Sequence, residues 1–441
     1  MAGLPRFDGS RNRSDRGSGG YVTSLVGGTV ATAAQQTTVR PRLDGLDVLR
    51  GAAVGAVLLG HSWPGIFQGA GIVGVIVFFV LSGYLITGVL LRDVERHRKI
   101  RYGRFYAHRA FRLLPALISF LGVYAIVELT ADVLGDRSKG IIGYTVLAGF
   151  GYLKDLPLPF DVSLAIGPLW TLAVEEQFYL IWPALLVFAL RRNRQGRLIG
   201  WSAAVVLSLM TASVLAMLIL APQLHSLVYA LPTTWGLGLI VGSALRLYRV
   251  HVFSWFSGQR LRLAALLGSI LVLAALIFFP KANESPAFFF GGGPLAMAAA
   301  AVLVVLAASR TRVMPKWTRA LQLLGTVSYA AYLWNYVVIL WLNGGSTADL
   351  PPLVAVSAIL LTLLLAVISW HTVERLGRIA RRRFDKYYPD QRRPVSGGVS
   401  QDLDQTPMAA RQFRWDWVSA GSTAQAGSAP DSVSTVSAAG S

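Results

Sequence analysis

The chain has 441 residues, of which 54% are hydrophobic and only 14% are charged, and its mean hydropathy of +0.52 excludes an ordinary soluble domain. Its net charge of +19 lies mainly in short loops between apolar runs, so we expect contacts with membrane lipids and no nucleic-acid partner. It contains no cysteine, which excludes disulfides, a thiol nucleophile and Cys-ligated metals, and we expect no metal cofactor.

Three segments of the chain differ in composition. Residues 1–42 are rich in Gly, Ser, Arg and Thr without periodicity and predict a disordered cytoplasmic arm. Residues 43–375 predict a membrane domain, and residues 376–441 predict a cytoplasmic tail that is first basic and then disordered. The membrane domain is expected to be all-α and polytopic, with about ten transmembrane helices at 44–63, 70–91, 111–130, 165–190, 198–220, 226–248, 262–280, 294–309, 323–342 and 352–371.

The basic residues predict how these helices are oriented in the cell membrane. The most basic loops hold eight, four, four, four and six Lys or Arg residues, at 92–112, 191–197, 246–262, 310–319 and 375–386. With ten spans and both termini cytoplasmic, all of these loops face the cytoplasm. Residues 140–153 are apolar but short, and a span there would place 191–197 outside. We therefore expect a re-entrant or interfacial helix on the external side.

The first expected span carries ionisable residues that an inert span would not carry. Arg50 and His61 are eleven residues apart, which places them on one helix face about 16 Å apart along the axis, and Asp47 lies one turn before Arg50. Ionisable groups inside a membrane are costly and are commonly functional. Two simpler interpretations remain open, with Arg50 as a topology charge and His61 as an interfacial residue bonded to a loop. Gly51 and Gly55 predict close packing against another helix.

A second ionisable cluster lies in the run GPLWTLAVEEQFYLIWP at 167–183. Glu175 and Glu176 are about ten residues inside this apolar run, so neither is expected to face lipid. Glu175 shares a helix face with Thr171 and Tyr179 and is a candidate to orient the imidazole of His61. The alternative is a buried structural pair between a glutamate and an arginine of another span.

A third cluster is the basic run RYGRFYAHRAFRLLP at 101–115. Arg104, Arg109 and Arg112 are spaced so that several can meet on one helical surface, and guanidinium groups suit phosphate. These arginines are candidates to bind a phosphate-bearing cosubstrate, and the alternative is a loop that only fixes topology. Ser82 has no base near it in sequence, so it is interpreted as a packing residue at a helix bend.

These motifs, taken in order over residues 43–375, resemble the membrane O-acyltransferases of the acyltransferase-3 family. The resemblance is carried by LDGL with Asp44, by Arg50 and His61 with ten residues between them, by GVIVFFVLSGYLI at 74–86, by the run through Arg109, Arg112 and Pro115, by LWTLAVEEQFYLIWP at 169–183 and by VSYAAYLWN. Two positions depart from the family pattern. Asn335 stands where the family usually has His, so no catalytic role is assigned to it, and Glu374 is not followed by the usual x-Pro. Some members carry an additional hydrolase-type domain, for which this tail is too short and too polar.

The resemblance implies transfer of an acyl group, most often acetyl from cytoplasmic acetyl-CoA, to a hydroxyl of a glycan, a lipid or a small secreted molecule. His61 is expected to act as general base or acyl relay, with Glu175 orienting it and with Arg50 near the acyl donor. Arg104, Arg109 and Arg112 are expected to bind the CoA phosphates, and the expected supporting residues are Asp44, Asp47, Trp170, Glu176 and Tyr179. A proton-coupled transporter or flippase of a glycan or lipid is the alternative.

Overall fold

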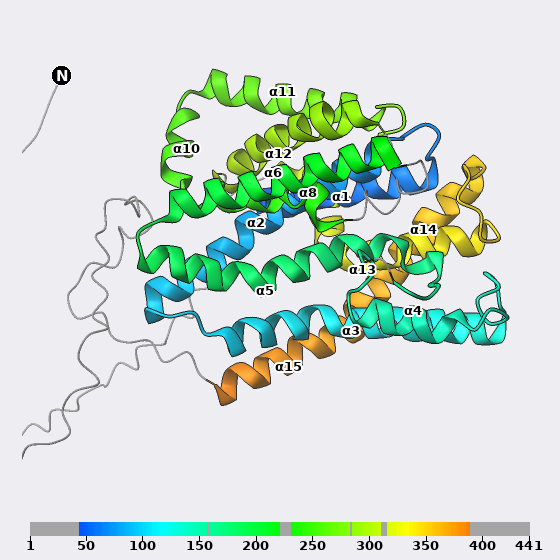
Figure 1. The fold of residues 1–441 in the computed structure, drawn as a ribbon. Helices are drawn as coiled ribbons and strands as arrows, with labels where there is room; N and C mark the ends of the chain where they lie inside the picture. The colour runs from blue at the N-terminus through cyan, green and yellow to red at the C-terminus, as the bar shows by residue number, and fades with distance from the viewer. Residues whose placement is uncertain (1–43, 157, 221–230, 283–284, 310–314, 389–441) are drawn as a thin grey trace, which may run out of the picture. The chain divides into compact units, whose positions relative to one another are not determined.

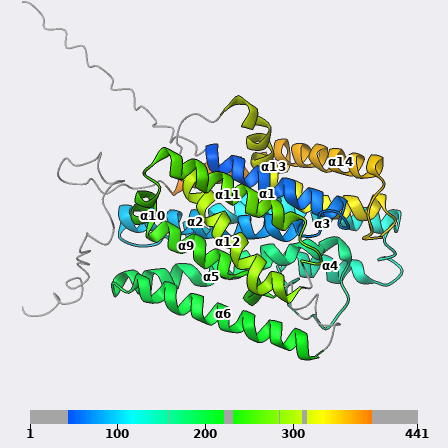
Figure 2. The ribbon, with the colours of Figure 1, turned by 90° about the horizontal axis from the view of Figure 1, so that it is seen from above.

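The computed structural model describes residues 44–156, 158–220, 231–282, 285–309 and 315–388, and every regular element in these ranges is a helix (Figures 1 and 2). The predicted all-α class is therefore confirmed for the described residues. The predicted N-terminal arm and most of the predicted tail lie outside them. The helices are α1 (Asp44–Ser62), α2 (Ala70–His97), α3 (Tyr102–Thr130), α4 (Ile141–Phe150), η1 (Leu164–Leu169), α5 (Trp170–Arg191), α6 (Gln195–Leu220), α8 (Pro232–Trp235), α9 (Leu237–Leu247), α10 (Arg249–Trp255), α11 (Gln259–Ile277), η3 (Phe288–Gly292), α12 (Gly293–Ser309), η4 (Lys316–Thr318), α13 (Arg319–Leu342), α14 (Pro352–His371) and α15 (Val373–Tyr387).

Six stretches of helix in the described residues are long and apolar enough to cross a membrane. They are Ala70–His97, Tyr102–Thr130, Leu164–Arg191, Gln259–Ile277, Phe288–Ala308 and Pro352–Tyr387. A seventh is formed by Lys316–Thr326 with Ser328–Leu342 if this pair, bent by 70°, counts as one span. The helix α1, which carries Asp47, Arg50 and His61 among apolar residues, is not among them. A total of ten spans, and the side of the membrane on which each terminus lies, therefore stay predictions.

Two expected helices differ in the structure from their predicted form. The expected span 226–248 is divided in its described part, because α8 ends at Trp235 and α9 begins at Leu237. The basic run 101–115 is largely helical, since α3 begins at Tyr102. The carboxylate of Asp93 accepts hydrogen bonds from the Arg101 backbone N–H and from Nε of Arg101, which closes the turn before α3. Hydropathy identified only the apolar part of α3, from residue 111 onward, and did not identify the polar turns at its N-terminal end.

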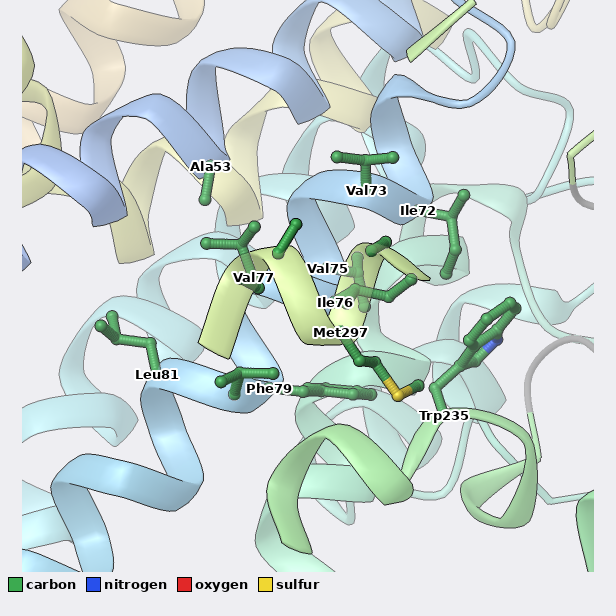
Figure 3. Close-up of a cluster of buried hydrophobic side chains, with 14 of the residues drawn as sticks. Ala53, Ile72, Val73, Val75, Ile76, Val77, Phe79, Leu81, Trp235 and Met297 are labelled. Atoms are coloured by element: carbon green, nitrogen blue, oxygen red, sulfur yellow. The ribbon is translucent and has the colours of Figure 1, made fainter. Parts of the chain in front are cut away.

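The helix α1 lies between two hydrophobic clusters and contributes to both. Leu46, Leu49 and Ala53 pack with α2, α9, α11 and α12, and part of this first cluster is drawn in Figure 3. Val54 and Val57 pack with α3, α4, η1, α13 and α14 in the second cluster. Because α1 is buried between these two groups of helices, its ionisable side chains face protein on most sides.

Close packing of α1 against α13 depends on glycines at their crossing. A Cβ at Gly51 would overlap the carbonyl oxygen of Leu321, and a Cβ at Gly325 would overlap the carbonyl oxygen of Asp47. Gly55 is different, because its nearest neighbour outside its own helix is Leu324 Cδ2, at 3.9 Å. The close packing predicted from Gly51 and Gly55 is thus found at Gly51, where helix backbones meet directly.

The segment 140–153 forms the ten-residue helix α4, which is shorter than a membrane span. The chain then returns beside α4, where the backbone N–H of Ser163 donates to Oγ1 of Thr145 at 2.8 Å. On the way back Asp155, which is 1% exposed, accepts a hydrogen bond from Nε2 of Gln177 at 2.6 Å, and burial raises the pKa of its carboxyl. This hairpin-like course agrees with the expected re-entrant or interfacial segment, whose placement in the membrane stays a prediction.

Candidate active site

Two cavities lie along α1, one near its middle and one near its C-terminal end. The first, here called the arginine cavity, has a volume of about 190 Å³ and is lined by three arginines, Arg50 from α1 with Arg109 and Arg112 from α3. Its other polar lining residues include Ser82, Glu175 and Tyr179. The second, here called the histidine cavity, has a volume of about 540 Å³ and is lined by His61, Gln68, Lys281, Tyr336 and Thr347 among others.

The guanidinium group of Arg109 is held rigidly in the wall of the arginine cavity. Its Nε and Nη2 donate to Glu176 Oε1 at 2.8 and 2.7 Å, and Nε also lies 2.9 Å from Oε2. Its Cζ lies 3.5 Å from the centroid of the Tyr179 ring, and its Nη2 is 3.9 Å from Glu175 Oε2. The paired carboxylate and the aromatic face fix the arginine before any ligand binds.

The charges around the arginine cavity favour an anion. Among its lining residues, three guanidinium groups face one carboxylate, that of Glu175. Arg50 is also paired with Asp47, but through a long contact of 3.4 Å between Nη1 and Oδ1. The carboxylate of Glu176 is bound by Arg109, and the buried Glu374 of α15 interacts electrostatically with Arg112, so an anion bound here would share these guanidinium groups with protein carboxylates. A phosphate or another anionic group is the natural ligand of such a set.

The imidazole of His61 is held by Asn335 of α13. Its Nδ1 lies 2.7 Å from Oδ1 of Asn335, whose side chain is fully buried. An amide oxygen accepts hydrogen bonds, so the tautomer that fits this contact has the proton on Nδ1 and the lone pair on Nε2. The ring of Tyr336 packs edge-on against the imidazole with the centroids 5.0 Å apart. The arrangement presents a neutral, oriented imidazole at the histidine cavity, as general base catalysis requires.

The two cavities adjoin each other. Val75 of α2 and Tyr332 of α13 line both of them. Arg50 and His61, eleven residues apart on one face of α1, therefore line two neighbouring cavities. One of these cavities carries three arginines, and the other carries the imidazole. Among the described residues, no group of three or more His, Asp or Glu side chains is placed to hold a metal ion.

The structure brings together most of the residues singled out from the sequence, but in two groups. Arg50, Asp47, Arg109, Arg112, Glu175, Glu176 and Tyr179 gather at the arginine cavity, whereas His61 and Trp170 line the histidine cavity. Glu175 accepts a hydrogen bond from the Tyr179 hydroxyl at 3.2 Å, and the Nδ1 of His61 is bound by Asn335 instead. Ser82, expected only to pack, lines the arginine cavity with its hydroxyl against that of Tyr179. The side chain of Asp44 lies outside the described part of the chain.

Arg104 is placed away from both cavities. Its Nη2 pairs with Asp385 of α15 at 2.7 Å, and its Nη1 donates to the carbonyl oxygen of Tyr388 at 2.7 Å. His108 shares the same carboxylate, with Nε2 at 2.7 Å from Oδ1. In the structure this arginine fastens α15 to α3.

Three residues of α13 belong to the site and were not identified from the sequence. Asn335 binds the imidazole of His61, Tyr336 packs against it and Tyr332 borders both cavities. All three lie in the run VSYAAYLWNY. One feature of the sequence could have indicated the role of Asn335. The family motif usually has His at this position, and both His and Asn have side chains that form hydrogen bonds.

Comparison with known families decides which kind of protein this geometry belongs to. The sequence profile of the acyltransferase-3 family, described as "Acyltransferase domain", matches residues 43–371. The chain belongs to the acyltransferase-3 family. Together with its apolar helices, this makes it a multi-pass membrane protein. The resemblance to this family seen in the sequence is thereby confirmed.

Several curated members of the acyltransferase-3 family are similar to this chain. The peptidoglycan O-acetyltransferase OatA of Listeria monocytogenes is 29% identical over 314 residues, which are 68% of this chain and 49% of the relative. The O-acetyltransferase OatA of Staphylococcus aureus is 27% identical over 344 residues, 75% of this chain and 56% of the relative. The putative peptidoglycan O-acetyltransferase YrhL of Bacillus subtilis is 30% identical over 354 residues, 76% of this chain and 54% of the relative. The chain thus spans about half the length of these relatives, and no solved structure matches it.

Proposed function

We propose that this protein transfers an acetyl group from acetyl-CoA, bound at the arginine cavity, to a hydroxyl of a cell-wall glycan at the histidine cavity. One observation carries the proposal. Three arginines line one cavity, a histidine whose Nδ1 is held by a buried amide lines the other, and the two cavities share Val75 and Tyr332. Together they would form a path for the acyl group. An acyl donor with phosphates suits one end, and a hydroxyl that must lose a proton suits the other.

In the proposed reaction, the acceptor hydroxyl oxygen attacks the thioester carbonyl carbon. The new C–O bond forms as the C–S bond breaks, and the hydroxyl proton passes to Nε2 of His61. CoA leaves as a thiolate, which takes up that proton and restores the neutral imidazole. If His61 carries the acyl group first, a bond from Nε2 to the acyl carbon forms as the C–S bond breaks. The acceptor oxygen then attacks this carbon, the C–O bond forms as the N–C bond breaks, and the hydroxyl proton passes to the CoA thiolate. Asn335 keeps Nε2 as the reactive nitrogen in both cases.

The proposed binding site of acetyl-CoA follows from the charge of the arginines and from the length of the CoA arm. Arg50, Arg109 and Arg112 would bind anionic groups of CoA, while Glu175 and Tyr179 keep the arginine side chains in position. CoA carries its thioester at the end of a long flexible arm, away from its phosphates. The arm can therefore extend along the path toward His61 while the nucleotide part stays outside a cavity of about 190 Å³. The basic loops next to this end support a position on the cytoplasmic side.

The proposed acceptor follows from the relatives and from the histidine cavity. The similar proteins of Listeria monocytogenes and Bacillus subtilis are named as peptidoglycan O-acetyltransferases, the second as a putative one. The histidine cavity is the larger of the two cavities, and its lining includes Trp170 and Tyr336 with the polar Gln68 and Lys281. Aromatic faces and hydrogen-bonding groups together suit a sugar.

The proposal is tested by acetyl transfer in bacterial membranes that contain the full chain. Membranes are supplied with isotope-labelled acetyl-CoA, and the glycans and lipids are then analysed by mass spectrometry. We expect labelled acetyl ester on the cell-wall glycan, and we expect H61A to lower its formation by about 10²–10⁴-fold, the usual contribution of a general base. H371A serves as the matched control, because His371 ends α14, is exposed and lines neither cavity.

Two results would contradict the proposal. Unchanged transfer by H61A at equal protein level would remove His61 from the reaction. Labelled acetyl on no product, with acceptors of the native host present, would argue against acyl transfer as a whole.

A further inference from the structure

The histidine cavity carries a positive charge that the proposed reaction does not use. Among the described residues that line this cavity, Lys281 has the one ammonium group, and none is Asp or Glu. Lys281 is exposed and lies in the turn after α11, so it belongs to the part of the cavity wall that meets solvent. An anionic group on a molecule that enters the cavity would find its counter-charge there.

The backbone at Lys281 is fixed by the loop between α1 and α2. The N–H of Lys281 donates to Oε1 of Gln68 at 2.6 Å, and Nε2 of Gln68 donates to the carbonyl oxygen of Gly65 at 3.1 Å. Close by, the N–H of Gly69 donates to the carbonyl oxygen of Ile277 at 2.9 Å. Gln68 therefore ties together two segments that both line the histidine cavity, and the lysine is held at its rim before a ligand binds.

The shape of this turn does not by itself explain why a lysine occupies it. Lys281 has a φ of 45°, in the left-handed region that glycine and asparagine adopt more readily than lysine. Its ammonium group forms no ion pair with the described part of the chain. Asp349, in the loop after α13, instead accepts a hydrogen bond from the Gly65 N–H at 2.7 Å and does not line the cavity. The charge of Lys281 is thus left for a ligand.

We propose that Lys281 binds an acidic group of the acceptor, so that the preferred acceptor is an anionic glycan. The inference rests on the proposed function, because it assumes that a glycan enters the histidine cavity. A carboxylate and a phosphate on the glycan offer the same chemistry, which is an anionic oxygen for the ammonium group. With the acidic group held at the rim and the sugar beside Trp170 and Tyr336, one hydroxyl would be turned toward His61.

The test compares three forms of one acceptor with the detergent-solubilised full chain and labelled acetyl-CoA. Cell-wall glycan fragments from the native host are supplied untreated, with their carboxylates amidated by methylamine, or with their phosphates removed by aqueous hydrofluoric acid. For the wild type, we expect one of the two treatments to lower kcat/KM by about tenfold, the lower end for a hydrogen bond to a charged group, because Lys281 is exposed. The treatment that does so identifies the acidic group as carboxylate or phosphate.

Three variants test whether the charge of Lys281 is responsible. K281Q keeps a long polar side chain without the charge, so on untreated fragments we expect about tenfold lower kcat/KM, mainly through KM, and no further loss on treated ones. K281R keeps the charge and should retain most of the wild-type preference. K139Q is the matched control, because Lys139 is exposed in the loop between α3 and α4 and lines neither cavity, so we expect wild-type values.

The outcomes that overturn this inference differ from those that overturn the proposed function. Equal kcat/KM of the wild type on all three forms, or a K281Q variant that still distinguishes them, rejects recognition by Lys281 and leaves acetyl transfer standing. K281R with the same loss as K281Q also rejects it, since the charge would then not be the cause. No transfer by the wild type to any form rejects the proposed function, and the inference with it.

Discussion

His61 has an amide as its partner, where many catalytic histidines have a carboxylate. A carboxylate next to an imidazole stabilises the protonated ring, whereas a neutral amide orients the ring without adding negative charge. The Asn335 Oδ1, 2.7 Å from Nδ1, therefore orients the imidazole of His61 without placing a negative charge beside it. This choice suits a base that must accept a proton from an alcohol in every cycle.

A pH profile tests this difference at the level of one residue. We expect wild-type transfer to fall as the pH drops and the imidazole of His61 takes up a proton, because the protonated ring cannot act as a base. In N335D the new carboxylate favours the protonated ring, so a higher pH is needed to obtain the neutral form. The acid limb of the profile should then move to higher pH, by about one unit.

The measurement is the initial rate of acetyl transfer between pH 5 and 8 for wild type, N335D and N335A. N335A keeps no partner for Nδ1, so we expect a lower rate at every pH without the shift seen in N335D. A flat wild-type profile over this range would count against a histidine base in the rate-determining step.

At the scale of the element, the path depends on how closely α1 and α13 approach each other. α1 supplies Arg50 and His61, while α13 supplies Tyr332 and Asn335. Their backbones meet where Gly51 faces Leu321 and where Gly325 faces Asp47. A side chain in this contact would separate the two helices and would move the residues that hold the imidazole.

Two alanine substitutions on the same face of α1 should therefore differ. G51A forces a methyl group into the carbonyl oxygen of Leu321, and we expect it to destabilise the protein by about 1–3 kcal/mol, the usual cost of overpacking. G55A meets only Leu324 Cδ2 at 3.9 Å, so we expect stability equal to or slightly above that of the wild type, since alanine favours helix.

Thermal unfolding in detergent, followed by the fluorescence of the 12 tryptophans, measures both variants. We expect a lower melting temperature for G51A and an unchanged or higher one for G55A. Equal melting temperatures for the two variants would contradict the direct backbone contact at Gly51.

The sequence was enough to predict the kind of element and many of the site residues. Repeated apolar runs require helices in a membrane, and buried charges such as Arg50 and Glu175 stand out against such runs. The pairing between distant helices could not be predicted in this way. Asn335 is 274 residues from His61, and nothing in the local pattern of either segment states that they meet. Arg104 illustrates the same limit. Its spacing from Arg109 grouped the two arginines, but the sequence pattern did not indicate that Asp385, far along the chain, pairs with Arg104.

At the scale of the whole molecule, the proposed reaction requires a direction. The arginine cavity must open toward the compartment that holds acyl-CoA, and the histidine cavity toward the acceptor. The distribution of Lys and Arg predicts this orientation, with the loops 92–112 and 246–262 in the cytoplasm. The loops after α3 and after α13 would then lie outside, on the side of the histidine cavity.

The absence of cysteine makes this orientation directly measurable. Single cysteines can be introduced at exposed serines, with Ser254 in α10 predicted to be cytoplasmic and Ser138 and Ser346 predicted to be external. In intact cells, a membrane-impermeant maleimide should label S138C and S346C but not S254C. After the membrane is permeabilised, all three should react, which shows that the cysteine in S254C is accessible. The reverse pattern would place the arginine cavity away from cytoplasmic acyl-CoA and would make the proposed direction of transfer impossible, even with every side chain of the site in its place.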